Sequence, residues 1–300
     1  MTTTSSQPAS ARQGLLARHP LVSYFLLSFA FTWALLFSVL LSKDGLGLLP
    51  YGVSPALASA IVPASLFGPS LAALIVTAAT EGGAGVGHWL RRIVRWRVGL
   101  RWYLFVLFGL PAVMVLGTLL RPGALASFDI SALPSVLAYL GAFAFMVFLG
   151  GPLGEEPGWR GFALPRLQRL HGPLVGGLIL GSLWALWHLP GFLVPQKLPP
   201  SGTVMDFVRF AVALIALAYV IQFVFNNTGG SVLLAILTHA TWNTFYSAAL
   251  VEVFPAPAVV GSYLNLTIAG WVLALALIAL TRGRLGYRHR QEAVQEPRVR

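Results

Sequence analysis

Long apolar stretches, separated by short polar ones, dominate the pattern along this chain. A membrane-spanning helix needs ~20 mostly apolar residues, and eight stretches meet or approach that length. The second stretch contains Pro63 and Pro69, where we expect a kink, and apolar residues prolong the fourth as far as Leu164. The pattern predicts an all-α, polytopic transmembrane helix bundle of about eight spans, at residues 21–42, 55–80, 102–120, 130–154, 172–194, 204–225, 231–251 and 257–281.

Polar ends flank one continuous apolar region. Residues 1–20 are rich in Ser and Thr, and residues 282–300 are charged. The chain shows neither an internal sequence repeat nor a second domain. We therefore expect a cytoplasmic N-terminal tail, a single transmembrane domain at 21–281 whose polar, chemistry-bearing half lies at about 140–250, and a cytoplasmic C-terminal tail.

The distribution of Lys and Arg predicts the orientation. Eight spans put both termini on one side, where 16 of the 20 Lys and Arg residues fall, and 4 fall on the other side. The positive-inside rule then places both termini in the cytoplasm, and we expect the protein in the plasma membrane. Residues 87–102 interleave Arg with Trp, Leu and Val, which predicts an amphipathic elbow on anionic lipid.

Composition narrows the functional classes. Hydrophobic residues make up 57% of the chain and charged residues 10%, which is too few to cover the surface of a soluble domain. The orientation rule accounts for the net charge of +11, so we do not expect nucleic acid as a partner. The absence of cysteine excludes disulfides and thiolate metal sites.

The first polar cluster within the apolar region is Gly154-Glu155-Glu156-Pro157-Gly158-Trp159-Arg160-Gly161. Ionisable groups inside spans are costly and mark functional sites by default. Glu156 and Arg160 are four residues apart, which predicts a pair on one helix face, and Glu155 points about 100° away. The alternative is an ordinary ion pair solvated at a helix end.

Two further clusters lie on later helices. His188 stands in an apolar helix, and His239 with Asn243 share a helix face through their spacing of four. Each alone could be an interhelical hydrogen-bonding group. Counted inward from the predicted cytoplasmic interface at 1.5 Å per residue, Glu155, His239 and His188 lie ~16, ~18 and ~24 Å deep. This convergence predicts a polar catalytic site inside the bundle.

These clusters together resemble the CPBP family of intramembrane proteases, which comprises CAAX prenyl endopeptidases and bacteriocin-processing or self-immunity proteins. The match Glu-Glu-x-x-Trp-Arg-Gly at 155–161 is its most specific part, and the resemblance covers about 148–243. The candidate site residues are Glu155, Glu156, Arg160, His188, His239 and Asn243.

Two departures from the family pattern stand out. The family usually has Phe four residues before the second-motif His, and Trp184 holds that place here, where we expect it to keep the packing role. Pro157 directly follows the glutamate pair and can open the helix there.

The resemblance implies peptide hydrolysis by an activated water. A buried carboxylate suits the general base, and side-chain donors suit the oxyanion. The resemblance assigns the base to Glu155, the sharing of its water to His188, the oxyanion donors to His239 and Asn243, and the support of Glu156 to Arg160.

The sequence does not decide whether the site uses a metal ion. Glu155, His188 and His239 would be a known zinc ligand set. The same residues work without a metal in a glutamate protease, which we favour because the chain has no His-Glu-x-x-His. The choice of base between Glu155 and Glu156 is likewise open.

Other classes of protein remain as alternatives. Midplane Glu, Arg and His also suit a proton-coupled membrane transporter, and the chain could be a non-catalytic scaffold or immunity protein. A protease with a Ser or Asp nucleophile is disfavoured, because Gly-x-Ser-x-Gly is absent and Asp206 falls near an outer span end. The expected partners are membrane lipid and a peptide or membrane-protein substrate, lipidated or not.

Overall fold

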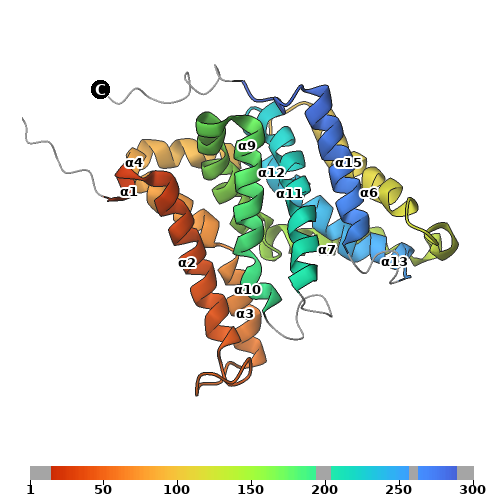
Figure 1. Ribbon diagram of the computed structural model, residues 1–300, viewed down its shortest axis with the longest axis horizontal. Coiled ribbons are helices and arrows are strands. Elements are labelled where there is room, and N and C mark those ends of the chain that lie inside the picture. Colours follow the sequence, from red (N-terminus) through yellow and green to blue (C-terminus); the bar gives the residue numbers. More distant parts are fainter. Residues whose placement is uncertain (1–14, 194–203, 257–262, 289–300) are drawn as a thin grey trace, which may run out of the picture.

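The computed structural model describes residues 15–193, 204–256 and 263–288 (Figure 1). Most of the two predicted tails, the loop with Lys197 and the start of the last predicted span at 257–262 lie outside these ranges. The regular elements of the described residues are helices, and no strand occurs among them. The all-α fold class is thereby confirmed.

The α-helices follow the predicted apolar segments. Each of the eight predicted segments overlaps at least one helix. The bounds are α1 Leu15–Arg18, α2 Pro20–Leu40, α3 Pro55–Ser65, α4 Gly68–Ile93, α5 Leu100–Leu104, α6 Leu110–Leu119, α7 Val136–Leu149, α8 Pro152–Gly158, α9 Leu164–Trp187, α10 Leu189–Phe192, α11 Val204–Asn227, α12 Val232–Phe245, α13 Val251–Val253 and α15 Leu264–Leu280.

Some of these helices join end to end. π-helical turns continue α5 into α6 at Phe105–Gly109, α8 into α9 at Trp159–Ala163, and α12 into α13 at Tyr246–Leu250. Among the described residues, five helical stretches, two of them interrupted at Gly82 and Gly172, are long and apolar enough to cross a membrane, and three shorter apolar helices accompany them. The chain is a multi-pass membrane protein with a helical bundle, as predicted.

Long helices of the bundle lie side by side. Figure 1 shows α2, α9, α11 and α15 running in a similar direction across the molecule, with α2 at the left, α15 at the right and α6 beyond α15. The segment after α15 lies at the upper edge of this view, and α1 lies lower, at the left. The segment after α15 returns to the bundle, where Leu285 is buried and its carbonyl accepts a hydrogen bond from Asn226.

The second predicted span is broken more strongly than a single proline kink would require. α3 ends at Ser65, after Pro63, and α4 starts at Gly68. α4 then runs past the predicted end at residue 80, with a reversal of the backbone at Gly82 (φ 66°). The predicted elbow at 87–102 is therefore helical up to Ile93, then turns, and enters α5 at Leu100.

The fourth predicted span, at 130–154, is wrong as one continuous helix. α7 ends at Leu149, and Gly151 adopts φ 115°, a conformation that glycine tolerates and other residues avoid. A new helix starts at Pro152 and continues to Trp187 with one further reversal at Gly172. The two glutamates consequently lie in the first turns of a new helix.

Gly154 and Gly158 fix how close this new helix comes to its neighbour. They are four residues apart and face the break between α3 and α4. A Cβ on Gly154 would lie 2.6 Å from the Leu66 carbonyl oxygen, and one on Gly158 would lie 2.5 Å from the Pro69 carbonyl carbon. Small residues at such an interface let backbones approach closely, which is a main source of helix association in lipid.

Gly158→Ala should destabilise the bundle by about 1–3 kcal/mol, because the added methyl meets backbone that cannot move aside. Gly87→Ala is the matched control, since nothing lies within 4 Å of its Cβ position. Thermal unfolding in detergent measures both variants. Equal unfolding temperatures for the two variants would contradict the close approach.

Candidate functional site

The first turn of α8 places both glutamates in the interior. Pro152 occupies the start of the helix, where its missing N–H costs nothing, and the Glu155 N–H bonds the Gly151 carbonyl. Glu155 is 2% exposed and Glu156 is fully buried. Buried carboxylates need partners, so their contacts define the site.

Glu156 shares one carboxylate oxygen between two partners. Its Oε1 accepts a hydrogen bond from Arg160 Nη1 at 2.8 Å and lies 3.0 Å from His239 Nδ1 on α12. The Arg160 side chain is fully buried. The predicted pairing of Glu156 with Arg160 is confirmed, and the contact with His239 ties α8 to α12.

Trp184 contributes more than the packing expected from the sequence. Its indole Nε1 donates to Glu155 Oε2 at 2.6 Å. Arg160 Cζ lies 4.3 Å from the Trp184 ring, and the His239 ring packs against it edge-on at 5.0 Å. The expectation that Glu155 stays free was wrong for one oxygen, because the indole holds it.

His188 lies at the end of a helix rather than within it. It is the C-cap of α9, and its Nδ1 lies 2.8 Å from the Trp184 carbonyl oxygen one turn earlier. Its ring packs edge-on against Trp187 at 4.7 Å and against Phe210 of α11 at 5.1 Å. Trp184 thus contacts Glu155 through its side chain and His188 through its backbone.

These contacts set the tautomers of both histidines. A carbonyl oxygen and an ionised carboxylate only accept hydrogen bonds, so we assign the proton to Nδ1 in His188 and in His239. In a neutral ring, Nε2 is then an acceptor. His239 can donate from Nε2 only when both of its ring nitrogens carry a proton.

Several polar atoms of the site are unpaired. Glu156 Oε2 and Arg160 Nε and Nη2 are buried without a hydrogen-bond partner in the described residues. Asn243, partly buried one turn after His239, has no hydrogen bond through its side chain within the same ranges. Unpaired buried polar groups in a native structure call for an explanation, and a polar substrate is one.

Trp89 is a contributor that the sequence analysis missed. Its indole donates to the Pro157 carbonyl at 2.9 Å, directly after the glutamates and just before the π-helical turn. π-helical turns are frequent at functional sites. The basic elbow around Trp89 indicated a lipid-facing residue, and no spacing rule connects it with Pro157, 68 positions away.

The geometry does not assemble a zinc site. Where the chain is described, no three His, Asp or Glu side chains gather closely enough to hold a metal ion. The possible zinc ligands named from the sequence, Glu155, His188 and His239, are therefore not close enough together here to hold a metal ion.

Glu156→Ala should lower stability by about 3–5 kcal/mol, because it leaves the Arg160 charge buried without its carboxylate. The double variant with Arg160→Ala should recover part of this loss. Thermal unfolding in detergent compares the two variants with the unmodified protein. If Glu156→Ala unfolds at the unmodified temperature, the pair does not support the fold.

Comparison with known proteins bears on the same segment. The family model described as type II CAAX prenyl endopeptidase Rce1-like matches residues 136–245. A curated relative, CAAX prenyl protease 2 of Methanococcus maripaludis, is 26% identical over 136 residues, which are 43% of this chain and 50% of the relative. The chain therefore spans about half the length of the curated relative that it matches.

The matched range contains every one of the six candidate residues, from Glu155 on α8 to Asn243 on α12. It also contains Trp184, which joins them. Through this segment, the chain is similar to type II CAAX prenyl endopeptidases, which supports the resemblance to the CPBP family that the motifs carry.

Proposed function

We propose that this protein is an intramembrane endopeptidase in which Glu155 activates the attacking water. The observation that carries the proposal is the buried group of Glu155, Glu156, Arg160 and His239 around Trp184. It lies in the segment that matches the endopeptidase family. Its unpaired buried polar atoms suit a polar backbone substrate.

Glu155 is the better placed of the two carboxylates to act as a base. Both oxygens of Glu156 are buried, and its Oε1 already serves Arg160 and His239. Glu155 has one oxygen held by the indole, which leaves Oε1 for a water. The indole thus orients the carboxylate, and the second oxygen takes the proton.

The reaction then balances in two steps. Water loses a proton to Glu155, and its oxygen bonds to the peptide carbonyl carbon, which gives a tetrahedral oxyanion. The amide C–N bond next breaks, and the leaving amine takes the proton back from Glu155. The Asn243 amide donates to the oxyanion between these steps, and His239 donates through Nε2 when both of its ring nitrogens carry a proton.

The supporting residues hold this geometry. Glu156 fixes the His239 ring through Nδ1. Arg160 in turn holds Glu156. His188, oriented by the Trp184 carbonyl, presents Nε2 as an acceptor for the same water.

The curated relative supports a proposal for the substrate class. The name of the curated relative specifies a CAAX prenyl protease. We propose that this chain likewise cleaves a peptide bond near a membrane-embedded, lipidated end of its substrate.

Glu155→Gln should reduce cleavage by about 100-fold or more, because the amide cannot take the proton from water. The amide oxygen can still accept from Trp184, so folding should be retained. The assay separates the products of a prenylated peptide and of its unprenylated counterpart. Glu252→Gln, at an exposed site, is the control. Unchanged cleavage by Glu155→Gln would refute the role of Glu155, and absent cleavage by the unmodified protein would favour a transporter or scaffold.

Trp184→Phe should lower kcat about tenfold or more, because it removes the hydrogen bond to a charged carboxylate and keeps an aromatic ring. Trp187→Phe is the matched control, since its buried indole N–H has no partner within the described ranges. Cleavage kinetics and thermal unfolding are measured for both. A purely structural role for Trp184 would lower stability without a selective loss of kcat.

A further inference from the structure

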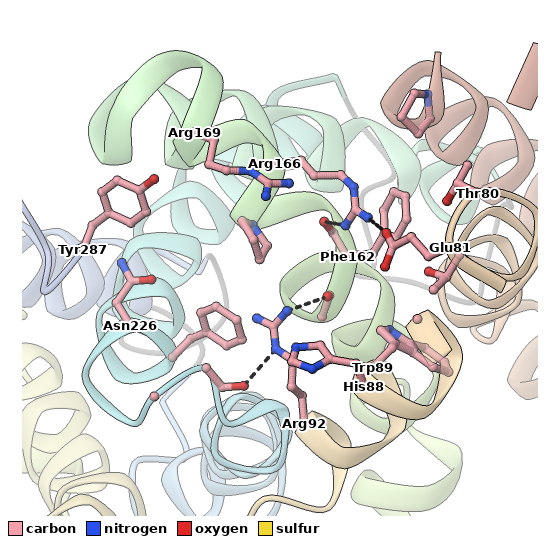
Figure 2. Close-up of a pocket in the computed structure, with 18 of the residues that line it drawn as sticks. Thr80, Glu81, His88, Trp89, Arg92, Phe162, Arg166, Arg169, Asn226 and Tyr287 are labelled. Carbon is pink, nitrogen blue, oxygen red and sulfur yellow. Dashed lines mark hydrogen bonds and ion pairs between the residues drawn. The ribbon is translucent and has the colours of Figure 1, made fainter. Parts of the chain in front are cut away.

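A polar cavity lies apart from the two glutamates of α8. It encloses about 350 Å³ between α4, the helix formed by α8 and α9, the α11–α12 turn and the segment after α15. None of the six candidate site residues lines it. Figure 2 shows Arg166 and Arg169 on one side of this cavity and Arg92 with His88 on the opposite side.

The charge of the lining is strongly positive. Four arginines line the cavity, namely Arg92, Arg166, Arg169 and Arg288, against one acid, Glu81. With His88 neutral, the formal charge of the residues that line the cavity is +3. Arginine guanidinium groups match phosphate oxygens in geometry as well as in charge.

Protein contacts fix two of these arginines in place. Arg92 donates to the carbonyls of Gly161 at 3.3 Å and Gly230 at 3.4 Å, and it lies over the Phe225 ring. Arg166 donates to the Phe162 carbonyl, lies over the same residue's ring and pairs with Glu81. The positive wall is therefore preorganised, which reduces the entropic cost of binding an anion.

An apolar groove continues directly from the cavity. A second hollow of about 330 Å³ shares Pro20, Arg166 and Arg169 with it. Its other walls include Leu21, Val22 and Leu170, and Val22 and Leu170 are 58% and 68% exposed. A polar basic site joined to an exposed apolar groove has the shape of an amphiphile site.

We propose that these two hollows form one binding site for an anionic phospholipid. The phosphate headgroup occupies the cavity between Arg92 and Arg169, and an acyl chain lies along Val22 and Leu170. A free phosphate has the same headgroup chemistry, but it leaves the groove without a role. A lipid bound in this way occupies a defined site, whereas the elbow at 87–102 would only adsorb to a charged membrane surface. Binding at this site does not depend on the proposed peptidase activity.

The site touches the backbone of the helix that carries the glutamates. Arg92 bonds the Gly161 carbonyl, and Trp89, another lining residue, bonds the Pro157 carbonyl. A lipid bound there would rest against both contacts. Lipid composition can therefore bear on the backbone of this helix.

The test uses the full chain purified in a neutral detergent. Its thermal unfolding is followed while phosphatidylglycerol, phosphatidylcholine or inorganic phosphate is added. Phosphatidylglycerol should raise the unfolding temperature to a plateau, and phosphatidylcholine should not. Arg169→Gln, at an exposed position, should weaken the half-saturation about fivefold, the value expected for one arginine at a lipid surface.

Two further variants distinguish binding in the cavity from nonspecific attraction between the lipid and the positive charge of the protein. Arg91→Gln removes the same charge from the next position to Arg92 but outside both hollows, and it should bind as the unmodified protein does. Ala84→Phe keeps the charge and fills the cavity, and it should weaken binding. Equal weakening by Arg91→Gln and Arg169→Gln, or full binding by Ala84→Phe, would overturn the proposal. A plateau reproduced by inorganic phosphate alone would overturn the lipid assignment.

Discussion

The close approach of two backbones is the constraint on which the rest of this structure depends. Gly154 and Gly158 bring α8 against the break between α3 and α4, with no side chain between them. Helices in lipid gain little from apolar contact, so such packing must hold them together. Once the glycine face is fixed against α4, the other faces of α8 turn Glu155 and Glu156 toward α9 and α12. The placement of the carboxylates is therefore a consequence of two positions that carry no side chain.

The hydropathy of the chain predicts the fold class because the thickness of a bilayer sets one length for every span. It does not predict the breaks, because these depend on single positions. Gly151 ends one helix and Pro152 starts the next within a stretch that is apolar throughout. The split of α3 from α4 at Leu66 and Phe67 is likewise invisible to an average over twenty residues.

Local contacts of the site were predictable, and distant ones were not. The pairing of Glu156 with Arg160 follows from a spacing of four on one helix. The contact of Glu156 with His239 spans 83 positions, and no periodicity encodes it. The same holds for Trp184, whose place in the motif indicated an aromatic ring but whose indole N–H matters only because Glu155 lies opposite.

The π-helical turn at Trp159–Ala163 changes how positions along this helix correspond to one another. In an unbroken α-helix, eleven residues complete slightly more than three turns, so Arg166 would lie within about 20° of the face of Glu155. The turn inserts one extra residue, which rotates everything beyond it by about 100°. Arg166 consequently faces α4, where Glu81 is its partner. The same residues wound as an unbroken α-helix would turn this arginine toward the face of the glutamates, whereas a related chain that lacks the inserted residue would align across a one-residue gap and keep its arginine facing α4.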